Sequence, residues 1–349
     1  MNSERLLSPR SPKDGPCKEL RRFKMHVPTY EDVLRARKQI APYLLRTALH
    51  EYPALNDFIG ARVFIKHENH QPTGAFKVRG GLNLISQLAV DERERGVISA
   101  STGNHGQSVA YAARLFGVKA RIVVPENANP GKVAAMRGLG AEVIFHGATF
   151  DESRAHCEAM AEKQSLRYVH SGDEPLLIAG VATATAEMLE AEPEIEVIIV
   201  PVGGGSGAAG ACIVANEINP EIQVIGVQSQ ESRAAHDSWS NRELVARPNT
   251  TIAEGLATGT AFLLPQTIMW ERLNDFVLVS DEQMMRAMAW LIEYAHTMAE
   301  AAGASSLAAA HQLREKLKGK KIGLICSGGN VTPEQLEEAL KCANTPDQR

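Results

Sequence analysis

Lys77 lies in a short segment of small and apolar residues, TGAFKVRGG, at residues 73–81. Four small residues allow another part of the molecule to approach this backbone closely: Gly74, Ala75, Gly80 and Gly81. No carboxylate within the segment pairs with the ammonium group. An apolar setting near a helix start disfavours the charged form of a lysine, and the neutral amine can attack a carbonyl. The alternative is a solvated lysine without a chemical role, and this segment alone does not decide between the two.

A glycine-rich loop, VGGGSGAAG, follows an apolar run at residues 202–210. Gly205, Gly207 and Gly210 fit the GxGxxG pattern of dinucleotide-binding sites. Such a site needs an acidic residue at the end of the next strand, where this chain has Gln228. Free N–H groups in the loop and the positive end of the following helix still predict a phosphate site. The remaining alternative is a tight strand-to-helix turn that binds nothing.

Two further segments carry polar groups at the ends of expected strands. In STGNHGQ, at residues 101–107, Ser101 and Thr102 are expected to cap a helix. The N–H groups there, together with Asn104, can receive a carboxylate or phenolate oxygen. In CSGGN, at residues 326–330, Ser327 follows a strand, and two glycines allow a close approach. Each segment alone is also compatible with an ordinary cap or turn. Pyridoxal phosphate carries both groups that these segments call for, an aldehyde that can react with Lys77 and a phosphate that can bind the glycine-rich loop.

The composition sets limits on the class of protein. The chain has 349 residues, which suits two domains, and a net charge of -4 gives no general attraction to nucleic acid or anionic membranes. Five cysteines without CxxC spacing indicate neither a disulfide framework nor a zinc site, so a reducing cytoplasm is expected. Residues 1–27 are polar and contain no apolar signal segment, and we expect a disordered arm.

Short apolar runs alternate with longer stretches that are compatible with helices. This alternation predicts parallel sheets covered by helices on both faces. The runs form two groups, which indicates two sheets, and the chain is expected to cross between them in the turn-rich segment 168–180. The N-terminal group contains residues 61–68, 120–126 and 141–147, and the C-terminal group contains residues 195–202, 222–229 and 321–329. Residues 197–215 lack charges but contain Pro201 and five glycines, so a membrane-spanning helix is not expected.

The four segments, with TIAEGLATG at residues 251–259, resemble in order and spacing the fold-type II pyridoxal phosphate enzymes. Within that family they resemble the serine/threonine dehydratase and serine racemase branch, from about residue 28 to 335. The resemblance implies a tryptophan synthase beta-like α/β fold with two domains, each an open, mostly parallel sheet with helices on both faces. It implies a large cofactor-binding domain at residues 28–70 and 168–340 and a small substrate-side domain at residues 71–167.

The resemblance also implies how pyridoxal 5'-phosphate is held. Lys77 would bind it as a Schiff base and later remove the Cα proton of the substrate, while Phe76 lies against the ring. Asn104 would bond the ring hydroxyl, and Ser327 would face the ring nitrogen. Glu300 falls near that nitrogen, although Ala301 replaces the usual proline. The phosphate would lie on the loop formed by Gly203, Gly204, Gly205, Ser206 and Gly207.

The implied reaction is elimination of water from a 3-hydroxy amino acid such as threonine or serine, giving a 2-keto acid and ammonia. A serine hydroxyl does not keep the ring nitrogen protonated, which favours elimination over a long-lived carbanion. Arg154 resembles a substrate-domain arginine. The substrate carboxylate would bind the loop formed by Ser101, Thr102, Gly103, Asn104 and His105.

An amino-acid racemase of the serine type is the main alternative. Thr102 stands where the racemase branch has a proton-donating serine, and its methyl group crowds the catalytic hydroxyl. A nucleotide-binding dehydrogenase or a non-catalytic binding protein is the other alternative, and Gln228 counts against nucleotide binding. The expected partners are the amino-acid substrate and a second copy of the chain, as a homodimer, with neither nucleic acid nor a membrane.

No metal site is expected. The racemase branch holds a divalent cation through acidic side chains, and the matching positions here are Gln228, Ser232 and Ala234. A site so poor in carboxylates suits magnesium or calcium badly. His67 and His70, in HENH, lack a third ligand, so a packing role is expected for them.

Overall fold

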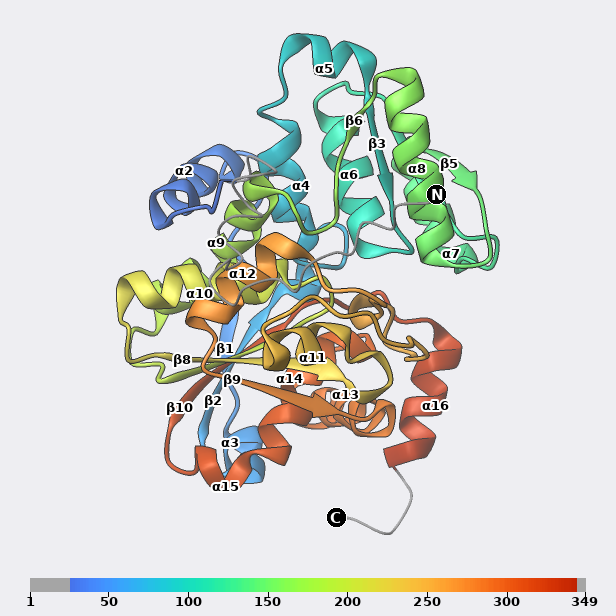
Figure 1. The fold of residues 1–349 in the computed structure, drawn as a ribbon. Helices are drawn as coiled ribbons and strands as arrows, with labels where there is room; N and C mark the ends of the chain where they lie inside the picture. Colours follow the sequence, from blue (N-terminus) through green and yellow to red (C-terminus); the bar gives the residue numbers. More distant parts are fainter. Residues whose placement is uncertain (1–25, 344–349) are drawn as a thin grey trace, which may run out of the picture.

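The computed structural model describes residues 26–343, so the arm predicted at residues 1–27 lies almost entirely outside the described part. Two lobes lie one above the other, each built on its own sheet (Figure 1). The expected α/β class with mostly parallel sheets is confirmed. Within residues 26–343, no helix is both long and apolar enough to cross a membrane.

The lower lobe contains a six-stranded sheet in the order β1-β2-β10-β7-β8-β9. All neighbouring strands in it are parallel except β1, which runs antiparallel to β2 at the edge. The strands are β1 (Leu49–Glu51), β2 (Arg62–His67), β7 (Val197–Pro201), β8 (Gln223–Ser229), β9 (Asp275–Val279) and β10 (Lys321–Cys326). The sequence pattern predicts that residues 61–68 share a sheet with residues 120–126 and 141–147. This prediction is wrong, because β2, which lies within residues 61–68, pairs with β10 in the six-stranded sheet.

The upper lobe contains a four-stranded parallel sheet in the order β5-β4-β3-β6. Its strands are β3 (Val97–Ala100), β4 (Ala120–Val124), β5 (Glu142–Phe145) and β6 (Arg167–Tyr168). The helices between β2 and β6 are α4 (Lys77–Ile85), α5 (Val90–Arg95), α6 (Asn104–Leu115), α7 (Pro130–Gly138) and α8 (Phe150–Gln164). The chain returns to the six-stranded sheet after β6, inside the segment expected for the crossing.

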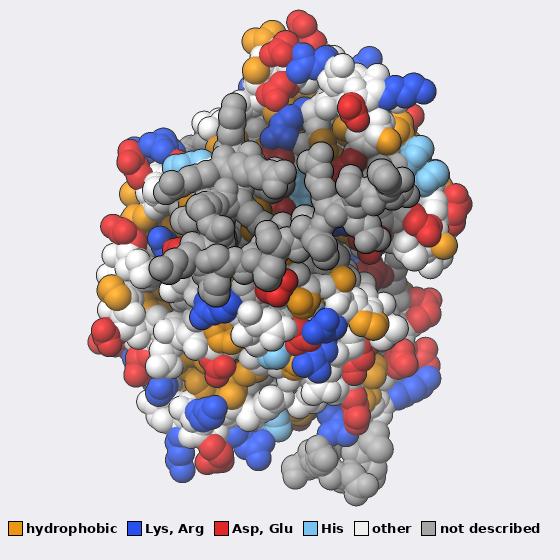
Figure 2. All heavy atoms as spheres, viewed as in Figure 1, with side chains coloured by type: hydrophobic (Ala, Val, Ile, Leu, Met, Phe, Trp, Pro, Cys, Tyr) orange, Lys and Arg blue, Asp and Glu red, His pale blue; other side chains and the backbone are white. Residues whose placement is uncertain are grey.

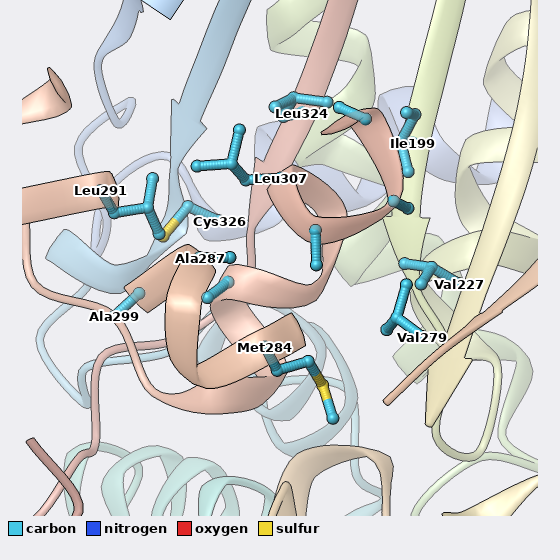
Figure 3. Close-up of a cluster of buried hydrophobic side chains, with 14 of the residues drawn as sticks. Ile199, Val227, Val279, Met284, Ala287, Leu291, Ala299, Leu307, Leu324 and Cys326 are labelled. Carbon is cyan, nitrogen blue, oxygen red and sulfur yellow. The ribbon is translucent and has the colours of Figure 1, made fainter. Parts of the chain in front are cut away.

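Helices cover both faces of the six-stranded sheet because its strands are apolar on both sides. In β7, Val197 and Ile199 face one core, and Ile198 and Val200 face the other. The first core packs under α13 (Asp281–Ala295) and α14 (Ala301–Gln312), and Figure 3 shows Leu307 beside Leu324 of β10 within it. The remaining helices of this lobe are α2 (Tyr30–Ile40), α3 (Pro53–Ile59), α9 (Pro175–Ala191), α10 (Ser206–Ile218), α11 (Ala234–Asn241), α12 (Leu263–Arg272), α15 (Arg314–Leu317) and α16 (Pro333–Ala343), with short 3-10 turns η1 (Glu68–His70), η2 (Gln230–Ser232) and η3 (Glu254–Leu256).

Charged side chains of both signs are interspersed on the face of the molecule seen in Figure 2. The visible side chains form no continuous stretch of one sign over the coloured surface.

Helix α4 is held between α9 and α6 by very close backbone approaches. A Cβ on Gly80 would lie 2.8 Å from the Leu177 side chain of α9, and one on Gly180 would lie 2.6 Å from the Arg79 carbonyl oxygen. On the other side, a Cβ on Gly81 would lie 2.2 Å from the Ser108 hydroxyl of α6. The glycines around Lys77 therefore allow two helices to press against the helix that begins with this lysine.

A buried network of four charges ties α4 to the six-stranded lobe. The Arg79 guanidinium donates to both Glu68 oxygens, at 2.7 and 2.8 Å, and to both Glu187 oxygens, at 2.8 Å each. Lys66 Nζ donates to Glu187 Oε2 at 2.6 Å, and Arg79 also donates to the Thr183 hydroxyl. Burial would raise the pKa of Glu68, but the Arg79 charge outweighs it and holds that pKa below its usual range. Two cations and two anions thus compensate one another away from water.

We predict that Arg79→Met lowers the free energy of unfolding by about 3–5 kcal/mol, because it leaves two buried carboxylates with Lys66 alone. The matched variant is Arg121→Met, which breaks a partly exposed ion pair with Glu142 and should cost about 0–1 kcal/mol. Urea denaturation of both variants checks this. Equal losses for the two variants would show that the buried network has no special weight.

Candidate active site

A cavity lies where the carboxyl ends of β3, β7 and β10 meet, which is where parallel sheets usually bind ligands. It holds about 870 Å³ of empty space, including its open mouth. The segments singled out in the sequence come together here. The expected site residues that line it are Phe76, Lys77, Ser101, Thr102, Gly103, Asn104, His105, Gly203, Gly204, Gly205, Ser206, Gly207, Glu300 and Ser327.

Lys77 is the first residue of α4, as its setting near a helix start predicts. Its Nζ donates to the Ser206 hydroxyl at 2.9 Å and to the Ser171 carbonyl at 3.0 Å. The removal of the ammonium from water lowers the pKa of Lys77 to about 8, and no carboxylate opposes this effect. The ring of Phe76 lies 5.5 Å from Nζ, measured to its centre. A large fraction of this amine is therefore neutral at mildly alkaline pH.

The glycine loop has a tight conformation that larger residues would disrupt. Gly205 has φ of +89° and forms the N-cap of α10, so the N-terminus of this helix is directed at the cavity. A Cβ on Gly203 would lie 2.4 Å from the Gly255 carbonyl oxygen, and one on Gly204 would lie 2.3 Å from the Phe262 ring. The loop thus exposes N–H groups in a place where side chains cannot shield them.

Neither Ser101 nor Thr102 occupies the N-cap position of α6. The N-cap is Gly103, and α6 begins at Asn104. The Ser101 hydroxyl still bonds the first turn, because it accepts from the N–H groups of Gly103, at 3.1 Å, and of Gly106 in α6, at 2.8 Å. The sequence placed the correct residue types at this turn but could not show that the hydroxyl folds back beneath the loop.

His105 is buried and neutral. Burial, and after it the charge of Lys77, lower the pKa of His105 to about 3. Its Nε2 lies 3.3 Å from the Val169 carbonyl oxygen, and its Nδ1 has no hydrogen-bond partner in the described part of the chain. Because the His105 ring is neutral, it adds no positive charge that could draw an anion away from the start of α6.

A chain of polar contacts crosses the cavity from Asn330 to Lys132. Asn330 Nδ2 donates to Asn104 Oδ1 at 2.8 Å, and Asn104 Nδ2 donates to Glu300 Oε1. Lys132 Nζ lies 3.6 Å from Glu300 Oε2 and 2.7 Å from Glu254 Oε2. Burial would lower the pKa of Lys132, but Glu300 and Glu254 outweigh it and raise that pKa, so this lysine stays charged. The amide of Asn104 is thereby held in one orientation.

Arg154 is the expected site residue that does not line the cavity. It lies on α8, and its guanidinium is 3.3 Å from Asp151 on the same helix. Sequence reasoning also assigned no role to several residues that do line the cavity. Glu254 lies in a segment already noted as matching a family motif, whereas no local signal marks the others: Lys132, Phe150, Ser171 and Phe262.

His67 and His70 pack as expected. Their rings are stacked with centres 4.9 Å apart, and His67 Nε2 is 2.9 Å from the Tyr52 hydroxyl. Burial, and then the neighbouring His70, lower the pKa of His67 to about 4. Within residues 26–343, no group of three or more His, Cys, Asp or Glu side chains is placed to hold a metal ion.

Comparison with known proteins points to one family. A family model for pyridoxal-phosphate dependent enzymes matches residues 40–328. An L-threonine ammonia-lyase from Thermotoga maritima is 36% identical over 89% of this chain and 78% of that protein. An L-threo-3-hydroxyaspartate ammonia-lyase from Saccharomyces cerevisiae is 36% identical over 88% of this chain and 94% of that protein. The solved structure of serine racemase from Dictyostelium discoideum aligns with a TM-score of 0.82 and 34% identity, over 88% of this chain and all of that one.

We predict that Lys77 becomes reactive with a midpoint near pH 8. Because its folded pKa is lowered, the neutral amine forms above about 8, whereas a free lysine side chain needs a pH above ~10.4. Protein freed of bound aldehydes is mixed with pyridoxal phosphate over a pH series, reduced with borohydride and digested, and labelling of Lys77 is read by mass spectrometry. A peptide with one lysine serves as the reference. A common midpoint for protein and peptide would rule out the desolvated amine.

Proposed function

The chain belongs to the family of pyridoxal-phosphate dependent enzymes, and we propose that within it the protein is an ammonia-lyase for a 3-hydroxy amino acid. The products of this reaction are a 2-keto acid and ammonia. Bound pyridoxal 5'-phosphate supplies an electron sink that weakens the bonds at the substrate Cα. Threonine and serine are the proposed substrates, supported by the identity to an L-threonine ammonia-lyase over most of the chain.

The cavity fits this cofactor. Lys77 offers an amine with a lowered pKa for the aldehyde, and the loop from Gly203 to Gly207 offers N–H groups for the phosphate. Asn104 offers an amide for the ring oxygen, and Ser327, which also lines the cavity, offers a hydroxyl. The observation that carries the proposal is the 2.9 Å hydrogen bond from Lys77 Nζ to Ser206 Oγ, because it joins the reactive amine to the phosphate loop.

Each polar group of the cavity has a role in this reaction. The neutral Lys77 amine takes the Cα proton, and its bonds to Ser171 and Ser206 hold Nζ in place for the transfer. The N-terminus of α6 binds the substrate carboxylate through its N–H groups, with the helix dipole in support. The Ser101 hydroxyl accepts from the N–H groups of Gly103 and Gly106 and so fixes the turn that leads into α6.

We assign Thr102 the second proton-transfer position, on the side of the site formed by the loop of residues 101–105. The side chain of this threonine is bulkier at Cβ than that of serine, and its single hydroxyl has fewer free rotamers. We therefore propose elimination as the main activity and racemisation as the minor one. Glu300 is proposed to act through Asn104, whose amide it holds, and Arg154 remains a proposed substrate contact at the rim.

We predict that the purified protein forms keto acid and ammonia in equal amounts from L-threonine or L-serine. Lys77→Ala should reduce kcat by on the order of a thousandfold, because it removes the base. The matched control Lys163→Ala changes an exposed lysine of α8 and should leave kcat unchanged. A coupled keto-acid assay and an ammonia assay measure both products, with L-threo-3-hydroxyaspartate as a third substrate.

The same experiment separates the alternatives. A racemase would return the opposite enantiomer with its amino group retained, which chiral chromatography of the remaining amino acid detects. A nucleotide-binding protein would stay colourless with pyridoxal phosphate and would tolerate Lys77→Ala. Retention of full activity in Lys77→Ala would refute the proposed role of this lysine.

We also propose that the protein is a homodimer. Leu45 is 89% exposed in the loop after α2, and Tyr43 packs its ring against Phe116 beside it, 5.1 Å between centres. An apolar side chain this exposed, next to an aromatic pair, suits a contact with a second copy.

We predict that light scattering on a sizing column gives twice the mass of one chain. Leu45→Glu should shift the protein toward single chains, because it places a charge in the proposed contact. Ile218→Glu, at another exposed apolar residue, should not shift it. A single-chain mass for the unaltered protein at all concentrations would contradict the homodimer.

A cytoplasmic location is likewise a proposal. Cys157, Cys212 and Cys326 are free and buried, and burial raises the pKa of Cys157 and of Cys212 to about 12. Thiols of this kind are poorly reactive and suit a reducing compartment.

A further inference from the structure

One wall of the active-site cavity is an irregular segment, residues 254–258, which contributes all five of its residues to the lining. It contains only the short 3-10 turn η3, so no regular helix or strand holds its remaining backbone in place. The Gly255 carbonyl lies directly against Gly203 of the phosphate loop. A shift of this wall would therefore disturb both the substrate pocket and the cofactor cradle.

The Ser232 side chain makes hydrogen bonds with the backbone of this wall. It lies in η2, directly after β8, and is fully buried. Its hydroxyl accepts from the Thr258 N–H at 3.1 Å and lies 3.2 Å from the carbonyl oxygens of both Leu256 and Thr258. One hydroxyl has one proton to donate and can accept two hydrogen bonds, so it serves the N–H and shares its proton between the carbonyls.

Gln228 lies four residues earlier and is also fully buried. Its Oε1 accepts from the His236 N–H at 3.0 Å, and its Nε2 has no hydrogen-bond partner among residues 26–343. An N–H donor repels a cation, whereas a carboxylate at the same place would attract one. Ala234, two residues beyond Ser232, has no ligand atom in its side chain. The side chains of Gln228, Ser232 and Ala234 therefore do not fit the divalent cation of the racemase branch that this chain resembles.

We propose that the Ser232 hydroxyl is the positioning group for the cavity wall at residues 254–258 and that it works without a divalent cation. The proposal rests on the proposed function only for its kinetic readout. Hydrogen bonds between Ser232 and the wall backbone fix residues 256 and 258 directly. The cavity is then preorganised by the fold alone, and its affinity for substrate does not depend on the supply of metal.

The first test is Ser232→Ala, which removes the hydroxyl that bonds three backbone groups of the wall and leaves the Thr258 N–H with the Leu256 carbonyl oxygen alone. KM for the amino acid should rise about tenfold, with a smaller change in kcat, because a lost buried hydrogen bond weakens binding by that order. Hydrogen exchange of residues 254–258 should become faster. The proposal is overturned if exchange of this segment and KM both stay as in the unaltered protein.

The matched control is Ser238→Ala. Ser238 is also fully buried and also bonds backbone groups, those of Ala234 and Val245, but it does not line or touch the cavity wall. Both variants should lose similar thermal stability, and the control should keep the KM and the slow exchange at residues 254–258. If the control raises KM as much as Ser232→Ala does, the role of Ser232 is general stability and the positioning role is refuted.

The second test removes metal. The holoenzyme is dialysed against EDTA, its metal content is measured by mass spectrometry, and magnesium or calcium is added back. We expect no bound divalent cation at the start, unchanged kcat and KM after EDTA, and no shift of the unfolding temperature on adding either ion. A stoichiometric cation, or a rise in unfolding temperature with added ion, would overturn the claim that Ser232 positions the wall without a divalent cation.

Failure of the proposed function is distinguishable from failure of this inference. If no keto acid forms from any substrate, hydrogen exchange at residues 254–258 and the affinity for pyridoxal phosphate still test Ser232. Ser232→Ala should weaken that affinity through the contact of Gly255 with Gly203, whereas Ser238→Ala should not. Equal affinities in the two variants would refute the positioning role independently of any activity.

Discussion

The structure depends on the fixed placement of α4 between α9 and α6. Lys77 begins this helix, and Arg79, two residues later, is buried among Glu68, Glu187 and Lys66. The glycines on either side bring the backbones into contact, so the helix can neither rotate nor slide without breaking compensated buried charges. A lysine at the start of so constrained a helix keeps its amine in one place. The phosphate loop, the wall at residues 254–258 and the turn under Ser101 are arranged around that fixed point.

Burial acts on two lysines of the cavity with opposite results. Lys77 has no carboxylate near its amine, so desolvation alone lowers its pKa to about 8. Lys132 is buried too, but Glu300 and Glu254 approach it and raise its pKa. The first lysine is therefore suited to chemistry and the second to holding the two lobes together. Lys132 belongs to α7 and its partners to the other lobe, so their ion pairs bridge the cavity. Charge compensation, rather than residue type, separates the two roles.

The sequence indicated much of the site because each of its parts follows from local chemistry. Glycines at 203–207, an apolar setting for Lys77 and polar groups after strands all depend on residues that are neighbours in the chain. The same local reasoning misplaced the N-cap of α6, which is Gly103, although the Ser101 hydroxyl does bond the first turn of this helix. It also gave no sign of Lys132, because the glutamates that explain this residue lie more than a hundred positions further along the chain.

The sequence by itself determined the α/β class, and its motifs indicated the cofactor and most of the expected residues that line the cavity, since periodicity and glycine placement are short-range properties. Only the tertiary structure decided the pairing of β2 with β10, the partners of Arg79 and the support of the cavity wall by Ser232. Each of these joins segments far apart in the chain, and many different long-range pairings are compatible with the same local pattern. The choice among them is made by packing and by the cost of burying an unpaired charge or hydrogen-bonding group.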